Sequence, residues 1–284
     1  MTIPIKLYPA LLALALVATS AAHAGEAWRA AGFKAPESVL FDQANNRLIV
    51  TNMNGGPGDV DGNGYLSLLS LDGKLIKQDW ASGMDAPKGM AIVGDRLYVA
   101  DITKLRVVDL ASGKLTSTID IAGSVFLNDM TAGMDGSVFV TDMLANAIYR
   151  IEGAKAELWL KDDALAMPNG IAADGERLIV GSWGKGMRED FSTEQPGGLI
   201  AVDVKSKAIS AMPGAGAFGN IDGVVVTGNV VFATDYMAGT LYRYADGKVE
   251  KLAVLKPGSA DIGTDGATIF VPMMNEGEVV ALKP

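Results

Sequence analysis

The chain has 284 residues, 49% of them hydrophobic, and its 33 acidic and 24 basic side chains give a formal net charge of −9. This acidic balance argues against a nucleic-acid partner, because phosphate binding requires clustered lysine and arginine. The chain has no cysteine and a single histidine, His23, which excludes disulfides, zinc sites of the Cys/His type and cysteine nucleophiles.

Residues 1–24 have the pattern of a secretory signal peptide. A single lysine precedes an apolar run over residues 7–18, and Ala22-His23-Ala24 provides a small-residue cleavage site. The run is too short to span a bilayer, so we expect cleavage and a periplasmic or secreted mature protein, residues 25–284, without a membrane span. An uncleaved anchor is the alternative. Cleavage would also remove His23 and with it any Ser-His-Asp triad.

After this leader, one short motif recurs six times, each time at the start of a hydrophobic strand. The motif is a proline or apolar residue followed by a mostly polar one, and it repeats every 39 to 53 residues. Such a period indicates a repeat architecture. The second residues of the six motifs are, in order, Glu37, Lys88, Asn128, Asn169, Asp222 and Asp261.

Each motif is followed by a second short β-branched strand, as in residues 47–52 and 230–235, and in several repeats by a third, as in 147–151. We see no convincing long amphipathic helix after the leader. Several strands per repeat and six repeats predict an all-β fold, a single six-bladed β-propeller of antiparallel blades around a central axis. A solenoid is the alternative, but a closed ring leaves only short, protected strand edges.

Two connections are long, residues 52–64 in the first repeat and 182–198 in the fourth. Both follow a second strand, which returns the chain to the face where the first strand began, so we expect both loops to overhang the strand starts. Long ordered loops on a rigid scaffold often carry function, although tolerated insertions are an equally good explanation.

The first long loop contains a candidate second calcium site. Asp59, Asp61 and Asn63 match the first positions of an EF-hand-type loop. The twelfth position is Ser70 instead of a bidentate glutamate, and no helices flank the segment. A Gly/Asp-rich hairpin loop is therefore the preferred interpretation.

Four of the five strand-start residues with oxygen side chains are candidate ligands of a hard cation: Glu37, Asn128, Asn169 and Asp222. A propeller brings the starts of its inner strands together around the axis, so these side chains could form an all-oxygen cage. Such a cage suits calcium, with magnesium, manganese or zinc as alternatives. The other interpretation is structural, because Asn-Gly and Asp-Gly are turn formers and Pro-Glu can open a strand.

Residues 127–130, Leu-Asn-Asp-Met, with Met134-Asp135-Gly136, and residues 168–171, Pro-Asn-Gly-Ile, resemble motifs of a known family. This family of six-bladed propellers includes gluconolactonase, regucalcin (senescence marker protein) and the luciferin-regenerating enzyme, and more distantly the paraoxonases. The resemblance covers about Phe33 to Leu282.

The resemblance implies one divalent metal near the axis, bound by Glu37, Asn169 and Asp222 with Asn128 beside it. It also implies hydrolysis of a lactone or related ester, with the metal as Lewis acid and Asp222 as both ligand and proton acceptor. Asp129 and Asp261 are reserve candidates for the base, but turn formation is the preferred explanation of each.

Two positions depart from the family pattern. Sugar-lactonase members have an arginine where this chain has Phe126, and paraoxonase-like members have a histidine where it has Lys88. Lys88 could bind an anion at the mouth of the pocket, although a solvated position on its rim is the preferred interpretation. Neither sugar binding through that arginine nor histidine chemistry can be carried over to this chain.

An apolar pocket wall is predicted from residues that recur just beyond the second strands. If the topology is correct, these side chains face the pocket and favour a hydrophobic lactone or ester, whereas ordinary packing under the loops would explain them equally well. They are Met53, Met143, Trp183, Met237, Met273 and Met274.

Three functions thus remain open from sequence. The first is a metal-dependent lactonase or esterase, and the second is a non-catalytic, metal-stabilised binding propeller in the periplasm. The third is a scaffold for protein partners, which has only the fold in its favour.

Overall fold

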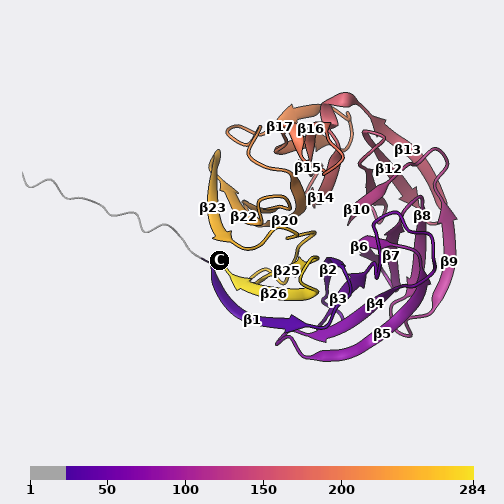
Figure 1. The fold of residues 1–284 in the computed structure, drawn as a ribbon. Helices are drawn as coiled ribbons and strands as arrows, with labels where there is room; N and C mark the ends of the chain where they lie inside the picture. The colour runs from indigo at the N-terminus through magenta and orange to yellow at the C-terminus, as the bar shows by residue number, and fades with distance from the viewer. Residues whose placement is uncertain (1–23) are drawn as a thin grey trace, which may run out of the picture.

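The computed structural model describes residues 24–284. The predicted signal peptide, residues 1–24, lies outside the described residues apart from Ala24. The strands form six four-stranded antiparallel sheets that stand as blades around a central axis (Figure 1). The predicted six-bladed propeller is therefore confirmed.

The strands of the first five blades follow the chain outward from the axis. Blade one consists of β2 (Pro36–Asp42), β3 (Arg47–Asn52), β4 (Gly64–Ser70) and β5 (Leu75–Met84). Blade two consists of β6 (Pro87–Val93), β7 (Arg96–Asp101), β8 (Lys104–Asp109) and β9 (Leu115–Asp120). Blade three consists of β10 (Leu127–Ala132), β11 (Val138–Asp142), β12 (Ala147–Glu152) and β13 (Lys155–Lys161). Blade four consists of β14 (Pro168–Asp174), β15 (Arg177–Ser182), β18 (Leu199–Asp203) and β19 (Ile209–Ala211). Blade five consists of β20 (Ile221–Thr227), β21 (Val230–Asp235), β22 (Thr240–Ala245) and β23 (Lys248–Val254).

Two further elements lie around blade four. A 3₁₀ turn, η1 (Asp163–Leu165), precedes β14, and the long connection after β15 contains a small hairpin, β16 (Gly184–Met187) and β17 (Thr193–Pro196). No helix within residues 24–284 is long and apolar enough to cross a membrane.

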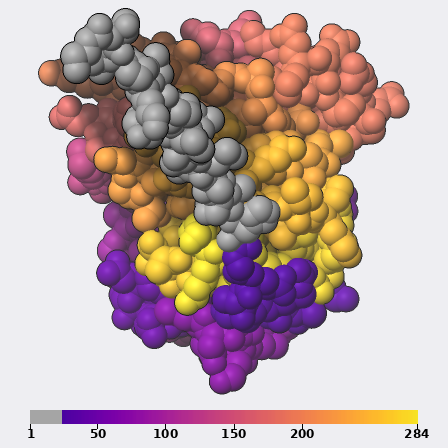
Figure 2. Space-filling model, turned by 90° about the vertical axis from the view of Figure 1, so that its left-hand side faces the viewer, coloured from indigo at the N-terminus to yellow at the C-terminus, as the bar shows by residue number. Residues whose placement is uncertain are grey.

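Blade six closes the ring with strands from both ends of the chain. Its order is β24 (Gly263–Thr264), β25 (Ile269–Met273), β26 (Glu278–Lys283) and then β1 (Gly25–Ala31) as the outer strand. Figure 2 shows the indigo N-terminal segment beside the yellow C-terminal one. Trp28 of β1 fastens this closure, because its indole N–H donates to the carbonyl of Leu71 at 2.8 Å and its ring packs on Phe270.

A β-bulge recurs at the start of the inner strand in blades one to five. In blade one the register shifts between Pro36 and Val39, so Glu37 and Ser38 lie within the bulge. The same shift occurs at the corresponding positions of β6, β10, β14 and β20. Because a bulge breaks the in-and-out alternation of a strand, it re-aims the side chains at that point. The motif read from the sequence is thus the site of a repeated backbone irregularity.

Threonines of the second strands stabilise three of these bulges. An amide that leaves the ladder needs another acceptor when it is buried, and here a threonine hydroxyl supplies it. The pairs are Ser38 N–H to Thr51 at 2.8 Å, Asp129 N–H to Thr141 at 3.0 Å and Gly223 N–H to Thr234 at 2.9 Å.

Glycines after the strand-start residues allow neighbouring inner strands to approach closely. A Cβ on Gly170 would overlap the carbonyl oxygen of Asp222, and one on Gly89 would overlap the backbone of Asp129. The glycine in these motifs therefore serves inter-blade packing at the axis. Apolar clusters of mostly buried strand residues fill the space between adjacent blades, for example Phe139, Ile171 and Val180 between blades three and four.

Candidate functional site

The four predicted oxygen side chains lie at one end of the axis and line a single cavity of about 180 Å³. They come from the inner strands of blades one, three, four and five, and each is at most 5% exposed. The recurrent bulge explains this convergence, because it turns the same position of each strand toward the axis. The residues are Glu37, Asn128, Asn169 and Asp222.

Each of these residues has one buried oxygen without a hydrogen-bond partner. Among residues 24–284 the unpartnered buried side-chain atoms include Oε2 of Glu37, Oδ1 of Asn128, Oδ1 of Asn169 and Oδ1 of Asp222. Buried polar atoms normally have a partner, since an unsatisfied one costs about 1–3 kcal/mol. Four such atoms from four blades at one point indicate a binding site.

The two amide groups are oriented by a common contact. The Nδ2 atoms of Asn128 and Asn169 both lie 4.0 Å from the sulfur of Met143, which is a weak acceptor. In this arrangement the amide nitrogens are engaged with the sulfur, and the amide oxygens remain free to bind a ligand.

Burial disfavours negative charge on both carboxyl groups of the cage. It raises the pKa of Glu37 well above its usual range, and the charges of Asp222 and Asp261 add to this effect. Burial also raises the pKa of Asp222, and the charges of Asp261 and Asp235 contribute. A cation bound between these carboxyl groups would stabilise their ionised forms and lower both pKa values, because opposite charge favours ionisation.

The donor set fits a hard divalent cation. Within the described part of the chain no group of three or more Asp, Glu or His side chains is arranged to hold a metal, but this site has two carboxylates and two amides. Carboxylate and amide oxygens are the ligands that calcium prefers, with water completing the coordination. Glu37, Asn128, Asn169 and Asp222 could therefore hold such an ion.

The structure contradicts the rim interpretation of Lys88. Its side chain is only 1% exposed and lines the same cavity as the oxygen cage. The bulge that turns the other strand-start residues inward acts on Lys88 too, which explains the error. Burial lowers the pKa of Lys88 to about 8, and the charges of Glu37 and Asp101 partly oppose this shift.

Phe126 lies directly beside this lysine. The Lys88 Nζ atom is 4.6 Å from the centroid of the Phe126 ring, within the range of a cation–π contact. Nζ also donates a hydrogen bond to the carbonyl of Ala86 at 3.1 Å. Both departures from the family pattern thus meet in one contact at the pocket wall.

Asp129 and Asp261 do not line this cavity. They lie beneath the cage and line a second axial cavity of about 230 Å³. Asp129 accepts hydrogen bonds from the amides of Met130 and Ile171, and the Ser38 hydroxyl donates to Asp261. Their contacts tie neighbouring inner strands together, which is a structural role.

The cavity wall is largely apolar, and the sequence predicted it in part. Met53, Met143, Met274 and Trp183 line the cavity, whereas Met237 and Met273 do not. Sequence reasoning missed three further lining residues: Pro57, Phe191 and Tyr236. Pro57 and Phe191 lie in the two long connections, so the expectation that these loops overhang the strand starts is confirmed.

Hydrogen bonds fix the wall on the side of blade four. The indole N–H of Trp183 donates to the carbonyl of Phe191 at 2.9 Å, and its ring lies 5.6 Å from that of Tyr236. Burial raises the pKa of Tyr236 to about 12, with the charges of Asp222 and Glu37 contributing. Tyr236 therefore enters the pocket as a neutral phenol.

The proposed second calcium loop is exposed, and its own groups engage its carboxylates. The amide of Gly56 donates to Asp59 at 2.6 Å, and the side chain of Asn63 donates to Asp61 at 2.6 Å. These contacts are those expected of a Gly/Asp-rich hairpin loop.

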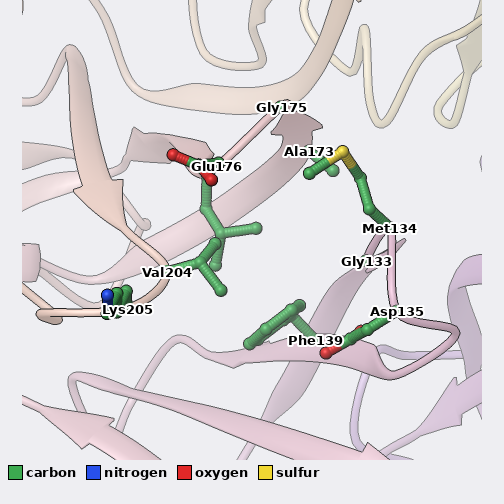
Figure 3. Close-up of a pocket in the computed structure, with 10 residues that line it drawn as sticks. Gly133, Met134, Asp135, Phe139, Ala173, Gly175, Glu176, Val204 and Lys205 are labelled. Atoms are coloured by element: carbon green, nitrogen blue, oxygen red, sulfur yellow. The ribbon is translucent and has the colours of Figure 1, made fainter.

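Another cavity, of about 200 Å³, opens between blades three and four at the turns that follow their inner strands. In Figure 3 Met134 and Asp135 lie on one side of it and Glu176, Val204 and Lys205 on the other. The carboxylate of Asp135 is already engaged by Ser137 and Arg150. This cavity is similar in size to the one lined by Glu37, Asn128, Asn169 and Asp222. The four unpartnered oxygens identify the cavity at the oxygen cage as the candidate site.

Fold and site define a six-bladed propeller with a buried oxygen cage at one end of its axis. The family model described as "SMP-30/Gluconolactonase/LRE-like region" matches residues 35–256, and the chain belongs to this family. No curated protein sequence matches the chain.

Solved structures show the same fold at low sequence identity. A gluconolactonase from Xanthomonas campestris superposes with a TM-score of 0.65 at 16% identity, covering 88% of this chain and 86% of that one. Virginiamycin B lyase from Staphylococcus aureus gives 0.61 at 15% identity, covering 88% and 94%. A streptogramin B lyase gives 0.61 at 13% identity with the same coverage. At these identities the likeness establishes the fold alone.

Proposed function

We propose that the protein is a divalent-cation-dependent hydrolase that opens a lactone or a related ester in the axial cavity. The observation that carries this proposal is the set of four unpartnered, buried oxygens contributed by four blades. Membership of a family that includes gluconolactonase supports the reaction class. When bound, a cation such as calcium supplies Lewis-acid polarisation of the substrate carbonyl.

The residues of this chain have separate tasks in the proposed reaction. Glu37, Asn128, Asn169 and Asp222 would hold the cation. Asp222 would also accept the proton of the attacking water and return it to the alkoxide oxygen that leaves when the acyl C–O bond breaks. The apolar wall binds the body of the substrate and excludes bulk water from the carbonyl.

The wall favours an apolar substrate over a free sugar. The cavity lining combines three methionines, a tryptophan, a tyrosine and two phenylalanines with few polar groups beyond the cage. Phe191 is 47% exposed at the same cavity, so apolar surface continues toward solvent. We infer an ester or lactone with an alkyl or aryl substituent.

We do not propose a lyase reaction for this chain, although the two lyases have the same fold. A variant of virginiamycin B lyase with one histidine replaced by alanine is described as catalytically inactive, whereas residues 24–284 of this chain contain no histidine. We also propose that the protein is exported after removal of residues 1–24. N-terminal sequencing of the protein recovered from the periplasm or medium would test this.

The test combines metal analysis with an activity panel. Purified protein should contain close to one equivalent of a divalent cation, hydrolyse apolar lactones or aryl esters, and lose activity in EDTA until calcium is restored. Full activity after chelation would refute the proposal. The alternative is a non-catalytic, metal-stabilised binding propeller, which is favoured by the presence of Phe126 where sugar-lactonase members have an arginine. No hydrolysis of any substrate in the panel, together with a lower melting temperature in EDTA, would support this alternative.

A further inference from the structure

Lys88 is an unusual cation for the wall of an apolar cavity. Its side chain is fully buried, and it is the one basic residue among those that line the cavity within residues 24–284. Removing an ammonium group from water is costly unless it is paired. Lys88 therefore needs partners, and the structure supplies only part of them.

The protein engages the ammonium group incompletely. One N–H donates to the carbonyl of Ala86 at 3.1 Å, and Phe126 contributes its ring face. An ammonium group has three donors. The ion pairs found among the described residues include Lys104 and Arg106 of the same blade but not Lys88, so no carboxylate lies within 4.0 Å of its Nζ atom.

A purely structural lysine would be expected to pair directly with the cage. Glu37 is near enough to influence the pKa of Lys88, yet the two groups form no ion pair. Once a divalent cation balances the carboxylates of Glu37 and Asp222, the positive charge of Lys88 has no counter-ion in the cavity. An apolar cavity with an unbalanced buried cation is suited to a ligand that brings one negative charge.

We propose that Lys88, held against Phe126, forms an anion subsite, and that the substrate is an apolar lactone or ester that carries one carboxylate. The carboxylate takes the two free N–H donors of Lys88, while the reacting carbonyl lies at the oxygen cage. Lys88 is thus a specificity residue. The reacting group in this statement rests on the proposed hydrolase function, whereas the anion subsite does not.

The matched ligands phenylacetate and phenylacetamide test the subsite, because they have the same shape and differ in charge. Calorimetric titration of the calcium-loaded protein should show that phenylacetate binds about ten- to a hundredfold more tightly, the range for a charged hydrogen bond. Lys88→Met should abolish the preference, and Lys88→Arg should retain it.

Three results would overturn the inference. They are equal affinity for the two ligands, no binding of phenylacetate to the wild-type protein, or a preference that persists in Lys88→Met and so comes from the metal. If Lys88→Met does not fold, Lys88→Gln, which is uncharged and keeps a polar end group, takes its place and should likewise abolish the preference. Because the titration needs no turnover, a protein that hydrolyses nothing can still show the preference.

Discussion

The backbone amide of Asp261 donates a hydrogen bond to the carbonyl of Glu37 at 2.9 Å, which joins blade six to the first ligand strand. Ser38 and Asp261 also form an isolated parallel bridge. The inner strand of blade six is only two residues long, Gly263–Thr264. The contacts of Asp261 with Glu37 and Ser38 therefore help to hold that blade at the axis. Ring closure and placement of Glu37 are therefore coupled.

Replacing Asp222 by asparagine should separate metal binding from stability. We expect calcium affinity to fall by more than about tenfold, the loss known even for outer-shell partners of metal ligands. The metal-free melting temperature should not fall, because a neutral amide avoids the desolvation that raises the pKa of Asp222. Calcium titration and thermal unfolding in EDTA measure both. The control is Asp135→Asn, a surface carboxylate paired with Arg150, which should leave calcium affinity unchanged.

Thr141→Val should be destabilising by about 2–4 kcal/mol, since it removes two buried hydrogen bonds. The Thr141 hydroxyl accepts from the amide of Asp129 and donates to the carbonyl of Asn169 at 2.7 Å. Thr227→Val is a matched control, because the Thr227 hydroxyl is buried without a partner among the residues described. Urea unfolding should show a large loss for the first variant and none for the second. Equal losses would contradict the bulge-stabilising role of Thr141.

Gly170→Ala should disrupt the contact between blades four and five. The new methyl group would overlap the carbonyl oxygen of Asp222 and displace a ligand strand. We expect a loss of stability of about 1–3 kcal/mol, typical of overpacking, together with weaker calcium binding. Gly216→Ala, where a Cβ meets nothing within 4 Å, should change neither quantity. Wild-type calcium affinity in Gly170→Ala would show that the inner strands tolerate separation.

The double variant Asp59→Asn, Asp61→Asn addresses the candidate second calcium site. Because Gly56 and Asn63 already engage these carboxylates, we expect the calcium content of the protein to stay the same. Elemental analysis of dialysed wild-type and variant protein provides the measurement. The loss of one equivalent in the variant would establish a second site in the loop.

The sequence predicted the propeller and the convergence of the four oxygen residues because both depend on register. A repeated strand-start motif fixes the number of blades, and closure of the ring then places the equivalent positions of blades one to five together, whereas Asp261 of blade six lines the second cavity. The same argument applied equally to Lys88. The polarity of lysine favours an exposed position, but the register of the motif outweighs it and buries the Lys88 side chain.

Other features depend on long-range pairing or backbone geometry. No local pattern in residues 25–31 reveals that β1 completes blade six, since its partner β26 lies at the other end of the chain. The bulges coincide with the strand-start motif, but that motif fits an ordinary turn or strand start equally well, so it does not predict a bulge. A signal did exist in the second strands, where Thr51, Thr141 and Thr234 occupy equivalent positions.

The closure of blade six also dictates the order in which the molecule can fold. Gly25 pairs with Lys283, so β1 has no sheet partner until β26, the last strand of the chain, has been synthesised and has folded into blade six. Contacts this far apart in sequence are slow to form. We therefore expect blades two to five to assemble first and the ring to lock in a final, separate step.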